Sequence, residues 1–277
     1  MDNGAIRSAS RWDAVSYAVV VRGLSALGIL ILLGPIVIVV TISFTDALAL
    51  RFPPPGYSLR WYLALFDTES SAEIQRAALN SLIVATCSTA IATTLGTLGA
   101  LAIARRSWNW AGRLDLIFMS PLVLPSLAVG LAMLMYFTLV GLRPSMPVLI
   151  AGHVVMIVPF VLRTTIANLN QLNPVLLESS ESLGASRFFT FRRVTLPLIM
   201  PGVGAGAFLA FMASFDNIAV SLFLTDARTE MLPIRMWGML ETRLDARVAA
   251  ISGLVSIATL VLLVIVDRLV RVDRQLR

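Results

Sequence analysis

Six long apolar runs dominate this 277-residue sequence and leave few folds open to it. Hydrophobic residues make up 57% of the chain and charged residues only 14%, whereas a soluble domain carries roughly 25% charged residues. Each run approaches the roughly 20 apolar residues that a helix needs to cross a bilayer. Backbone polar groups in lipid must be satisfied internally, so these runs are expected to be helices. The six predicted spans are 24–44, 77–104, 116–140, 147–167, 202–224 and 248–266.

Arginine placement predicts the orientation of these spans. The sequence contains no lysine, and all 22 basic residues are arginine. Most of them fall in segments that would share one side of the membrane, among them both termini and the polar loop 178–197. Because basic residues accumulate on the cytoplasmic side, we expect both termini and this loop to be cytoplasmic. The net charge of +6 then faces anionic lipid, and no nucleic-acid partner is expected.

The predicted fold class is therefore an all-α integral membrane protein with six transmembrane helices. The first run is longer than the 7–15 apolar residues of a cleaved signal peptide, so we expect a retained anchor. Four parts are expected along the chain: a cytoplasmic lead-in, a first helix with its external segment, a membrane core and a cytoplasmic tail. Their predicted bounds are 1–23, 24–75, 76–266 and 267–277.

The loop 178–197 has an unusual composition for a connector between two spans. It begins with carboxylates and small residues, and continues with aromatic residues and arginines. We expect a short helix over 176–183 and a bend at Gly184. A second helix, capped by Ser186, is expected to run to about Arg193, and Pro197 is expected to close it before the fifth span. Phe188 and the charged residues suit a contact with another protein. The alternative is an amphipathic element that touches only lipid.

The spacing within this loop resembles a known signature. Glu178, Ser179 and Ser180 are followed after three residues by Gly184, and after nine more by Val-Thr-Leu-Pro at 194–197. This is similar to the EAA signature, E-A-A, three residues, G, nine residues, I-x-L-P, of the permease subunits of binding-protein-dependent ABC importers. Two serines replace the alanines, and valine replaces the isoleucine. The resemblance covers roughly residues 76–266 and begins at Asn80, Ser81 and Leu82.

The resemblance implies that the loop between the fourth and fifth helices is a two-helix element that couples the permease to an ATPase. The implied coupling residues are Glu178, Ser179, Ser180, Gly184, Ala185, Phe188, Arg192, Leu196 and Pro197. It also implies a bacterial inner-membrane location and three kinds of partner: ATP-binding cassette ATPase subunits, a second permease subunit in a homodimer or heterodimer, and a periplasmic substrate-binding protein.

The chain is not expected to be an enzyme. A phosphate-binding P-loop needs a lysine, and this sequence has none. We therefore expect no catalytic residue, no cofactor and no metal in this chain, with ATP and magnesium bound by the partner ATPase. The only histidine, His153, lies in the fourth run and is expected to pack or to hydrogen-bond between helices. A role in the ligand path is the alternative.

Asp216 stands out in the fifth run, because an ionisable residue inside a span is costly and indicates function by default. The run resembles the spermidine/putrescine branch of the family, with an acidic pair reduced to Asp216 and Asn217. These two, with Phe211 and Phe215, form the candidate solute path for a polyamine or related cation. The alternatives are a structural hydrogen-bonding role for Asp216, another solute class such as amino acids, opines or phosphonates, and a secondary transporter or channel.

Overall fold

The computed structural model describes residues 3–104 and 111–275, which form helices joined by turns. The outermost residues of the predicted lead-in and tail, 1–2 and 276–277, lie outside the described residues, as do residues 105–110. The helices are α1 (Asn3–Ser43), α2 (Arg60–Phe66), α3 (Thr68–Ala104), α4 (Ala111–Val123), α5 (Ser126–Leu139), α6 (Met146–Leu169), α7 (Pro174–Ser182), α8 (Arg187–Thr190), the π-helical turn η1 (Phe191–Thr195), α9 (Leu196–Phe215), α10 (Ile218–Leu224), α11 (Leu232–Arg243) and α12 (Arg247–Gln275).

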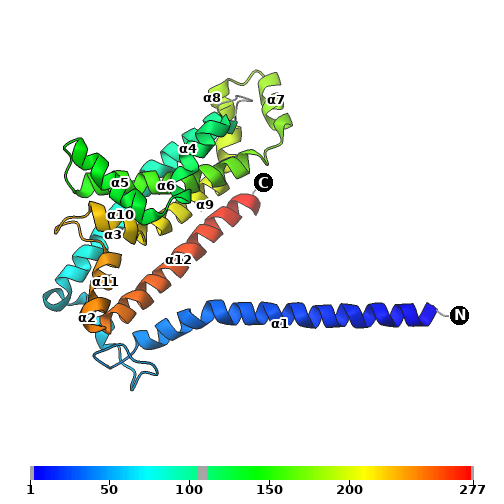
Figure 1. Ribbon diagram of the computed structural model, residues 1–277. Helices are drawn as coiled ribbons and strands as arrows, with labels where there is room; N and C mark the ends of the chain where they lie inside the picture. The colour runs from blue at the N-terminus through cyan, green and yellow to red at the C-terminus, as the bar shows by residue number, and fades with distance from the viewer. Residues whose placement is uncertain (1–2, 105–110, 276–277) are drawn as a thin grey trace. The chain divides into compact units, whose positions relative to one another are not determined.

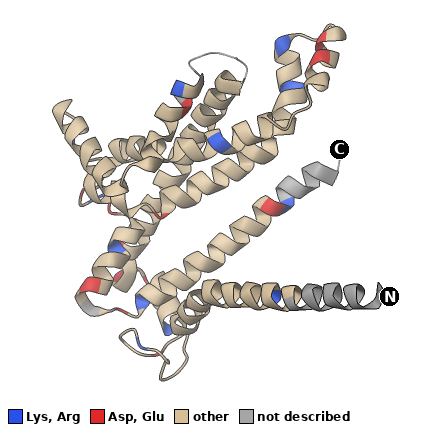
Figure 2. Cartoon of the chain, turned by 45° about the vertical axis from the view of Figure 1, so that its right-hand side comes forward, with Lys and Arg blue, Asp and Glu red and all other residues tan. Residues whose placement is uncertain are grey.

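The lengths of these helices confirm the predicted membrane fold. Within the described residues, five helices are long and apolar enough to cross a bilayer, or six if the bent pair α4 and α5 counts as one span. Figure 2 shows the same property as long helical stretches without charged residues. The all-α fold, with a two-helix loop between the fourth and fifth predicted spans, is therefore confirmed.

The third predicted span is not one straight helix, so the prediction for 116–140 is wrong in this respect. α4 ends at Val123, α5 begins at Ser126, and the two are bent by 110°. Pro125 lies at the break with φ −57° and ψ 122°. A proline lacks an N–H, and it disfavours helical geometry in the residue before it. The helix therefore ends before Pro125 and restarts in a new direction.

The fifth predicted span, 202–224, is also wrong as a single helix. α9 starts six residues earlier, at Leu196, and ends at Phe215. The chain resumes as the short helix α10 at Ile218, after a break of two residues. The side chain of Asn217 accepts a hydrogen bond from the N–H of Val220 at 2.9 Å, which is an N-cap, so a new helix starts here.

The chain divides into two compact units. One unit comprises residues 1–65 and 243–256, and the other comprises 66–242 and 257–277. In the first unit, the loop after α1 folds back on itself: the Tyr62 hydroxyl donates to Ser43 Oγ at 2.7 Å, and Trp61 Nε1 donates to the carbonyl of Ala47 at 2.9 Å. These bonds hold α2 against the end of α1.

The second unit is built on α3, α6 and α9, which lie side by side in Figure 1. Val161 of α6 is fully buried between the other two helices. A Cβ added at Gly96 of α3 would lie 2.8 Å from Val161 Cβ, and one added at Gly206 of α9 would lie 2.8 Å from Val161 Cα. The two glycines thus let the backbones approach closely, as is common between membrane helices.

Candidate coupling loop and solute site

The segment 178–197 begins with a helix and a tight turn. α7 starts after Asn173, whose side chain accepts a hydrogen bond from the N–H of Val175 at 3.1 Å. α7 ends at Ser182, and Gly184 follows with φ of +78°. This left-handed conformation favours glycine, since a Cβ would be strained there. The predicted bend at Gly184 is therefore confirmed.

The second helix of the loop continues further than predicted. Ser186 Oγ accepts a hydrogen bond from the N–H of Phe189 at 3.3 Å, which confirms the predicted cap. The helix does not end at Pro197, so that prediction is wrong: α8, η1 and α9 form one continuous helix. In the π turn the N–H of Leu196 bonds to the carbonyl of Phe191, five residues back. This shift in register accommodates a proline, which has no N–H to donate.

A side-chain hydrogen bond ties the two helices of this loop together. Ser180 Oγ and Thr190 Oγ1 lie 2.9 Å apart and are partly shielded from solvent. The N–H of Ala185 also bonds to the carbonyl of Ser180 at 3.1 Å. Ser180 occupies a position where the EAA signature has alanine, so this bond needs the serine. The α7–α8 hairpin is thereby fixed as a unit.

The outer surface of the hairpin combines apolar and charged side chains. None of the residues of α7, all of which the structure describes, is buried. Leu183 is 88% exposed and Phe188 is 71% exposed. Glu178, Ser179 and Arg192 are exposed too, while Ala185, Leu196 and Pro197 are half-buried. Figure 2 shows residues of both charges at this tip. Exposed apolar groups among charges are typical of an interaction surface.

The four candidate solute residues meet at the far end of α9. Asp216 ends this helix, and its side chain is exposed. Asn217 forms the break and uses its side-chain oxygen to cap α10. Phe211 and Phe215 lie one turn apart with stacked rings, whose centroids are 6.1 Å apart. Asp216 therefore lies at a helix end, not inside a helix, and its place in a solute path stays a prediction.

His153 bonds between helices, as predicted. It is fully buried in α6, and its two ring nitrogens lie 2.8 Å from Ser214 Oγ and 3.0 Å from Ser221 Oγ. Ser214 belongs to α9 and Ser221 to α10. Among residues 3–104 and 111–275, no group of three or more His, Cys, Asp and Glu side chains gathers as a possible metal site.

Asn80 and Ser81 have a structural role that sequence reasoning missed. Asn80 Nδ2 donates to the carbonyls of Arg228 and Glu230, both at 3.0 Å. Ser81 Oγ accepts from the N–H of Leu232 at 2.8 Å. The pair thus holds the segment that leads into α11. No local signal predicts these contacts, because the partners lie about 150 residues later in the chain.

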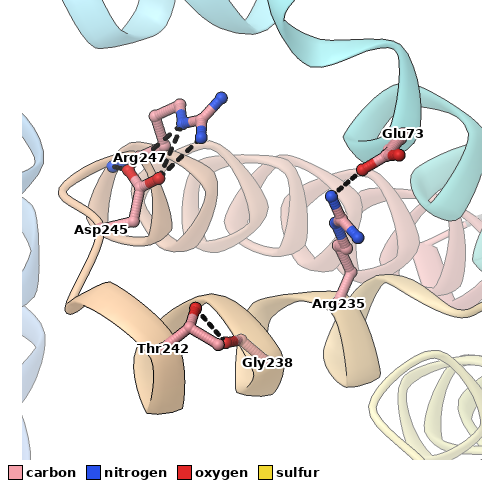
Figure 3. Close-up of polar contacts among 6 residues, drawn as sticks. All are labelled: Glu73, Arg235, Gly238, Thr242, Asp245 and Arg247. Carbon is pink, nitrogen blue, oxygen red and sulfur yellow. Dashed lines mark hydrogen bonds and ion pairs between the residues drawn. The ribbon is translucent and has the colours of Figure 1, made fainter.

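An ion pair joins the same two regions of the second unit. Arg235 of α11 pairs with Glu73 of α3 (Figure 3). The other terminal nitrogen of Arg235 lies 3.8 Å from Glu230. Figure 3 also shows Arg247 paired with Asp245, within the first unit. The distance between Arg247 Nη2 and Asp245 Oδ2 is 2.7 Å. Glu73 is 68% exposed, and a solvent-exposed pair such as Arg235–Glu73 contributes only about 0–1 kcal/mol. The uncharged bonds of Asn80 and Ser81 therefore carry more of the connection between α3 and the start of α11.

Comparison with known proteins assigns the chain to a family. Residues 92–272 match the family model described as "Binding-protein-dependent transport system inner membrane component". The chain belongs to this family. The permease is 31% identical over 246 residues to the spermidine/putrescine transport system permease protein PotC of Escherichia coli (strain K12), with 87% of this chain and 89% of PotC covered. It is 27% identical over 237 residues to the putrescine transport system permease protein PotI of the same strain, with 83% of each chain covered.

The fold agrees with the sequence match. The permease is similar to a chain of a bacterial ABC transporter involved in the import of the acidic polysaccharide alginate, with a TM-score of 0.72, 19% identity, and coverage of 96% of this chain and 98% of that chain. At this identity the likeness shows the fold alone. The family and the fold together confirm the prediction of a multi-pass inner-membrane permease subunit of an ABC importer.

Proposed function

We propose that this permease subunit imports a polyamine or a related organic cation, and that the α7–α8 hairpin couples it to an ATPase. The observation that carries the substrate class is the 31% identity, over most of both chains, to a permease named for spermidine and putrescine. The observation that supports the coupling is the exposed surface of the hairpin, which projects from the helices of the second unit in Figure 1.

The proposed coupling surface has the chemistry of a protein contact. Leu183 and Phe188 supply apolar groups that gain from burial, and Glu178 and Arg192 supply charges for hydrogen bonds with a partner. Gly184 sets the angle between the two helices through its positive φ. A partner that binds the hairpin therefore contacts a surface whose shape is already fixed.

The proposed solute path is centred on the break after α9. The exposed carboxylate of Asp216 favours a cation, and the stacked rings of Phe211 and Phe215 offer faces that attract ammonium groups. Asn217 adds polar atoms at the same point. A dicationic chain of methylenes has both of the features that these groups bind, namely charge and apolar length.

The proposed assembly follows from orientation and from the composition of the chain. Arginine placement supports a cytoplasmic location for both termini and the hairpin. With no lysine for a P-loop, ATP and magnesium bind to the ATPase subunits, two copies of which dock on the hairpins of two permease subunits. A periplasmic binding protein delivers the solute to the opposite face. The solute path then forms between this subunit and a second permease.

Coupling is tested by substitution at two glycines of the same kind. Gly184 and Gly141 both have positive φ, at +78° and +79°, and a Cβ meets no heavy atom within 4 Å at either position. Gly184→Asp should reduce co-purification of the ATPase with the tagged permease and reduce spermidine uptake by at least about tenfold. Gly141→Asp carries the same backbone strain and should keep both. Normal uptake and normal ATPase retention in Gly184→Asp would refute the coupling role.

The substrate class is tested with radiolabelled spermidine in cells that express the complete importer and lack other polyamine uptake. Spermidine uptake should be competed by unlabelled putrescine and left unchanged by amino acids or aminophosphonates. Asp216→Asn should lower the uptake rate while the complex still assembles, whereas Glu241→Gln, at an exposed carboxylate of α11, should not. Competition by an amino acid or a phosphonate in place of putrescine would overturn the polyamine assignment.

A further inference from the structure

His153 lies where α6 meets both sides of the α9–α10 break. Its side chain is completely buried, as are those of Ser214 and Ser221. Ser214 stands in the last turn of α9, and its Oγ lies 2.8 Å from Nδ1 of the imidazole. Ser221 stands in α10, and its Oγ lies 3.0 Å from Nε2. One side chain of α6 thus bonds to two helices that are joined by only two residues.

A further contact gives the direction of these bonds. The hydroxyl of Ser221 donates its only proton to the carbonyl of Asn217 at 2.5 Å. Ser221 Oγ therefore accepts at the imidazole, so Nε2 of His153 carries the proton and Nδ1 accepts from the hydroxyl of Ser214. The bonds run in one direction, from Ser214 through His153 and Ser221 to Asn217. Both ring nitrogens of His153 and the hydroxyls of Ser214 and Ser221 therefore have hydrogen-bond partners, which favours a single geometry.

The break needs such a support because its own backbone does not fix its geometry. The N–H groups of Asp216 and Asn217 still bond back into the last turn of α9, at 3.1 and 3.3 Å. Beyond them the helical ladder is interrupted and restarts at the Asn217 cap. α10 has seven residues, which is too short to be stable alone in water and too short to set its own direction. The angle between α9 and α10 therefore depends on contacts with other helices.

We propose that His153 is a positioning residue, which acts through Ser214 and Ser221 to hold the α9–α10 break and so sets where Asp216 and Asn217 stand. His153 itself touches no solute in this assignment. Its effect on the break depends on the geometry alone, while its effect on transport rests on the proposed solute path. The two claims are therefore tested with different measurements.

Three substitutions separate positioning from packing. His153→Leu fills a similar volume and removes both bonds, which leaves the two serine hydroxyls buried opposite an apolar group. His153→Gln offers an amide oxygen and an amide nitrogen in place of the two ring nitrogens, so it should rescue the position of the break. Ser221→Ala keeps the imidazole and removes the bond to the Asn217 carbonyl as well.

The geometric claim is tested by hydrogen exchange on the purified importer. His153→Leu should speed the exchange of amides at 216–221 by about tenfold and leave residues 84–92 of α3 unchanged. Ser221→Ala should show the same pattern to a smaller extent, and His153→Gln should stay within about twofold of the unmodified protein. Equal acceleration at 84–92 would mean a general loss of stability, and no acceleration at 216–221 would mean that the bonds do not hold the break. Either result overturns the inference.

The transport consequence is measured as spermidine uptake per assembled complex. His153→Leu should lower this rate about as far as Asp216→Asn does, and His153→Gln should restore it. If exchange at 216–221 rises while spermidine uptake stays normal in both His153→Leu and Asp216→Asn, the proposed solute path fails and the positioning role stands. If the exchange is unaltered, the positioning role fails whatever the uptake shows.

Discussion

Ser81→Ala provides a quantitative test of how α3 holds the start of α11. Ser81 is fully buried, and its Oγ accepts the N–H of Leu232, which is itself 3% exposed. Leu232 is the first residue of α11, so its N–H has no carbonyl partner within the helix. Removing the hydroxyl leaves a buried donor unsatisfied, which costs about 1–3 kcal/mol. The contact of Ser81 with the Met231 sulfur, at 3.8 Å, adds little.

The assay is hydrogen exchange at the Leu232 amide in the purified permease. A loss of about 2 kcal/mol in local stability corresponds to roughly 30-fold faster exchange. Ser88→Ala is the matched control on the same helix. Ser88 is equally buried, but it donates to the carbonyl of Ile150 at 3.2 Å. That carbonyl lies inside α6 and keeps its helical N–H partner, so the expected cost is at most about 1 kcal/mol.

The reasoning fails if the two substitutions behave alike. It also fails if Ser81→Ala changes the exchange rate at Leu232 by less than about threefold. In that case the N–H of Leu232 would have found another hydrogen-bond partner in the variant. Faster exchange at Leu232 together with unchanged exchange in the centre of α3 is the expected pattern. It would show that one serine hydroxyl, far away in sequence, serves as the N-cap of α11.

Three further outcomes follow from particular contacts. Gly206→Ala should destabilise the packing of α9 on α6 by about 1–3 kcal/mol in thermal unfolding, because the added Cβ would meet the backbone of Val161. Gly238→Ala is the control: its Cβ would meet no heavy atom within 4 Å, so it should be neutral or slightly stabilising. Ser180→Ala should speed hydrogen exchange in the α7–α8 hairpin, because it removes the bond to Thr190, a loss of about 0.5–1.5 kcal/mol. Ser179→Ala, at an exposed position, should leave the exchange in the hairpin unchanged. The hydroxyl of Thr229 and the N–H of Arg228 donate to the carboxylate of Asp226 and hold its pKa below the ordinary value for an aspartate. Because the folded pKa is the lower one, this contribution to stability is complete above about pH 4 and is lost as the pH falls through the folded pKa. Thermal unfolding between pH 6 and 3 should therefore show a steeper acid loss in the unmodified protein than in Asp226→Asn.

The parts of the fold that could be predicted from sequence depend on local signals. Long apolar runs can only be spans, and a glycine between two short polar helices marks a bend. Gly184 and Ser186 therefore stand where the sequence placed the turn and the cap. Both features depend on the conformational preference of one residue and on hydrogen bonds within three residues, so a single sequence suffices to predict them.

The parts that could not be predicted depend on tertiary contacts or on alternative helix geometries. A proline at position 197 predicts the end of a helix. The helix continues because the π turn before Pro197 shifts the hydrogen-bond register, so that no N–H is required at the proline. Pro125 does end a helix, and the sequence offers no reason why these two prolines should differ. The partners of Asn80, Ser81 and His153 lie between 61 and about 150 residues away. Their polar side chains were visible in the sequence, but no periodic pattern connects them to their partners.

One continuous helix connects the two proposed sites. It runs from Arg187 to Phe215, 29 residues, or roughly 43 Å at 1.5 Å per residue. Its first turn belongs to the exposed hairpin, and Asp216 follows its last turn. The two ends are held differently: the hairpin is tied by the bond of Ser180 to Thr190, whereas the break is pinned to α6 through buried His153. A displacement applied to the hairpin therefore acts on the end of this continuous helix that is not bonded to α6 through His153. Either the π turn absorbs this displacement, which leaves Asp216 in place, or α9 transmits it, which moves Asp216 only if the bonds of His153 break. The exchange rates at 216–221 distinguish these two outcomes.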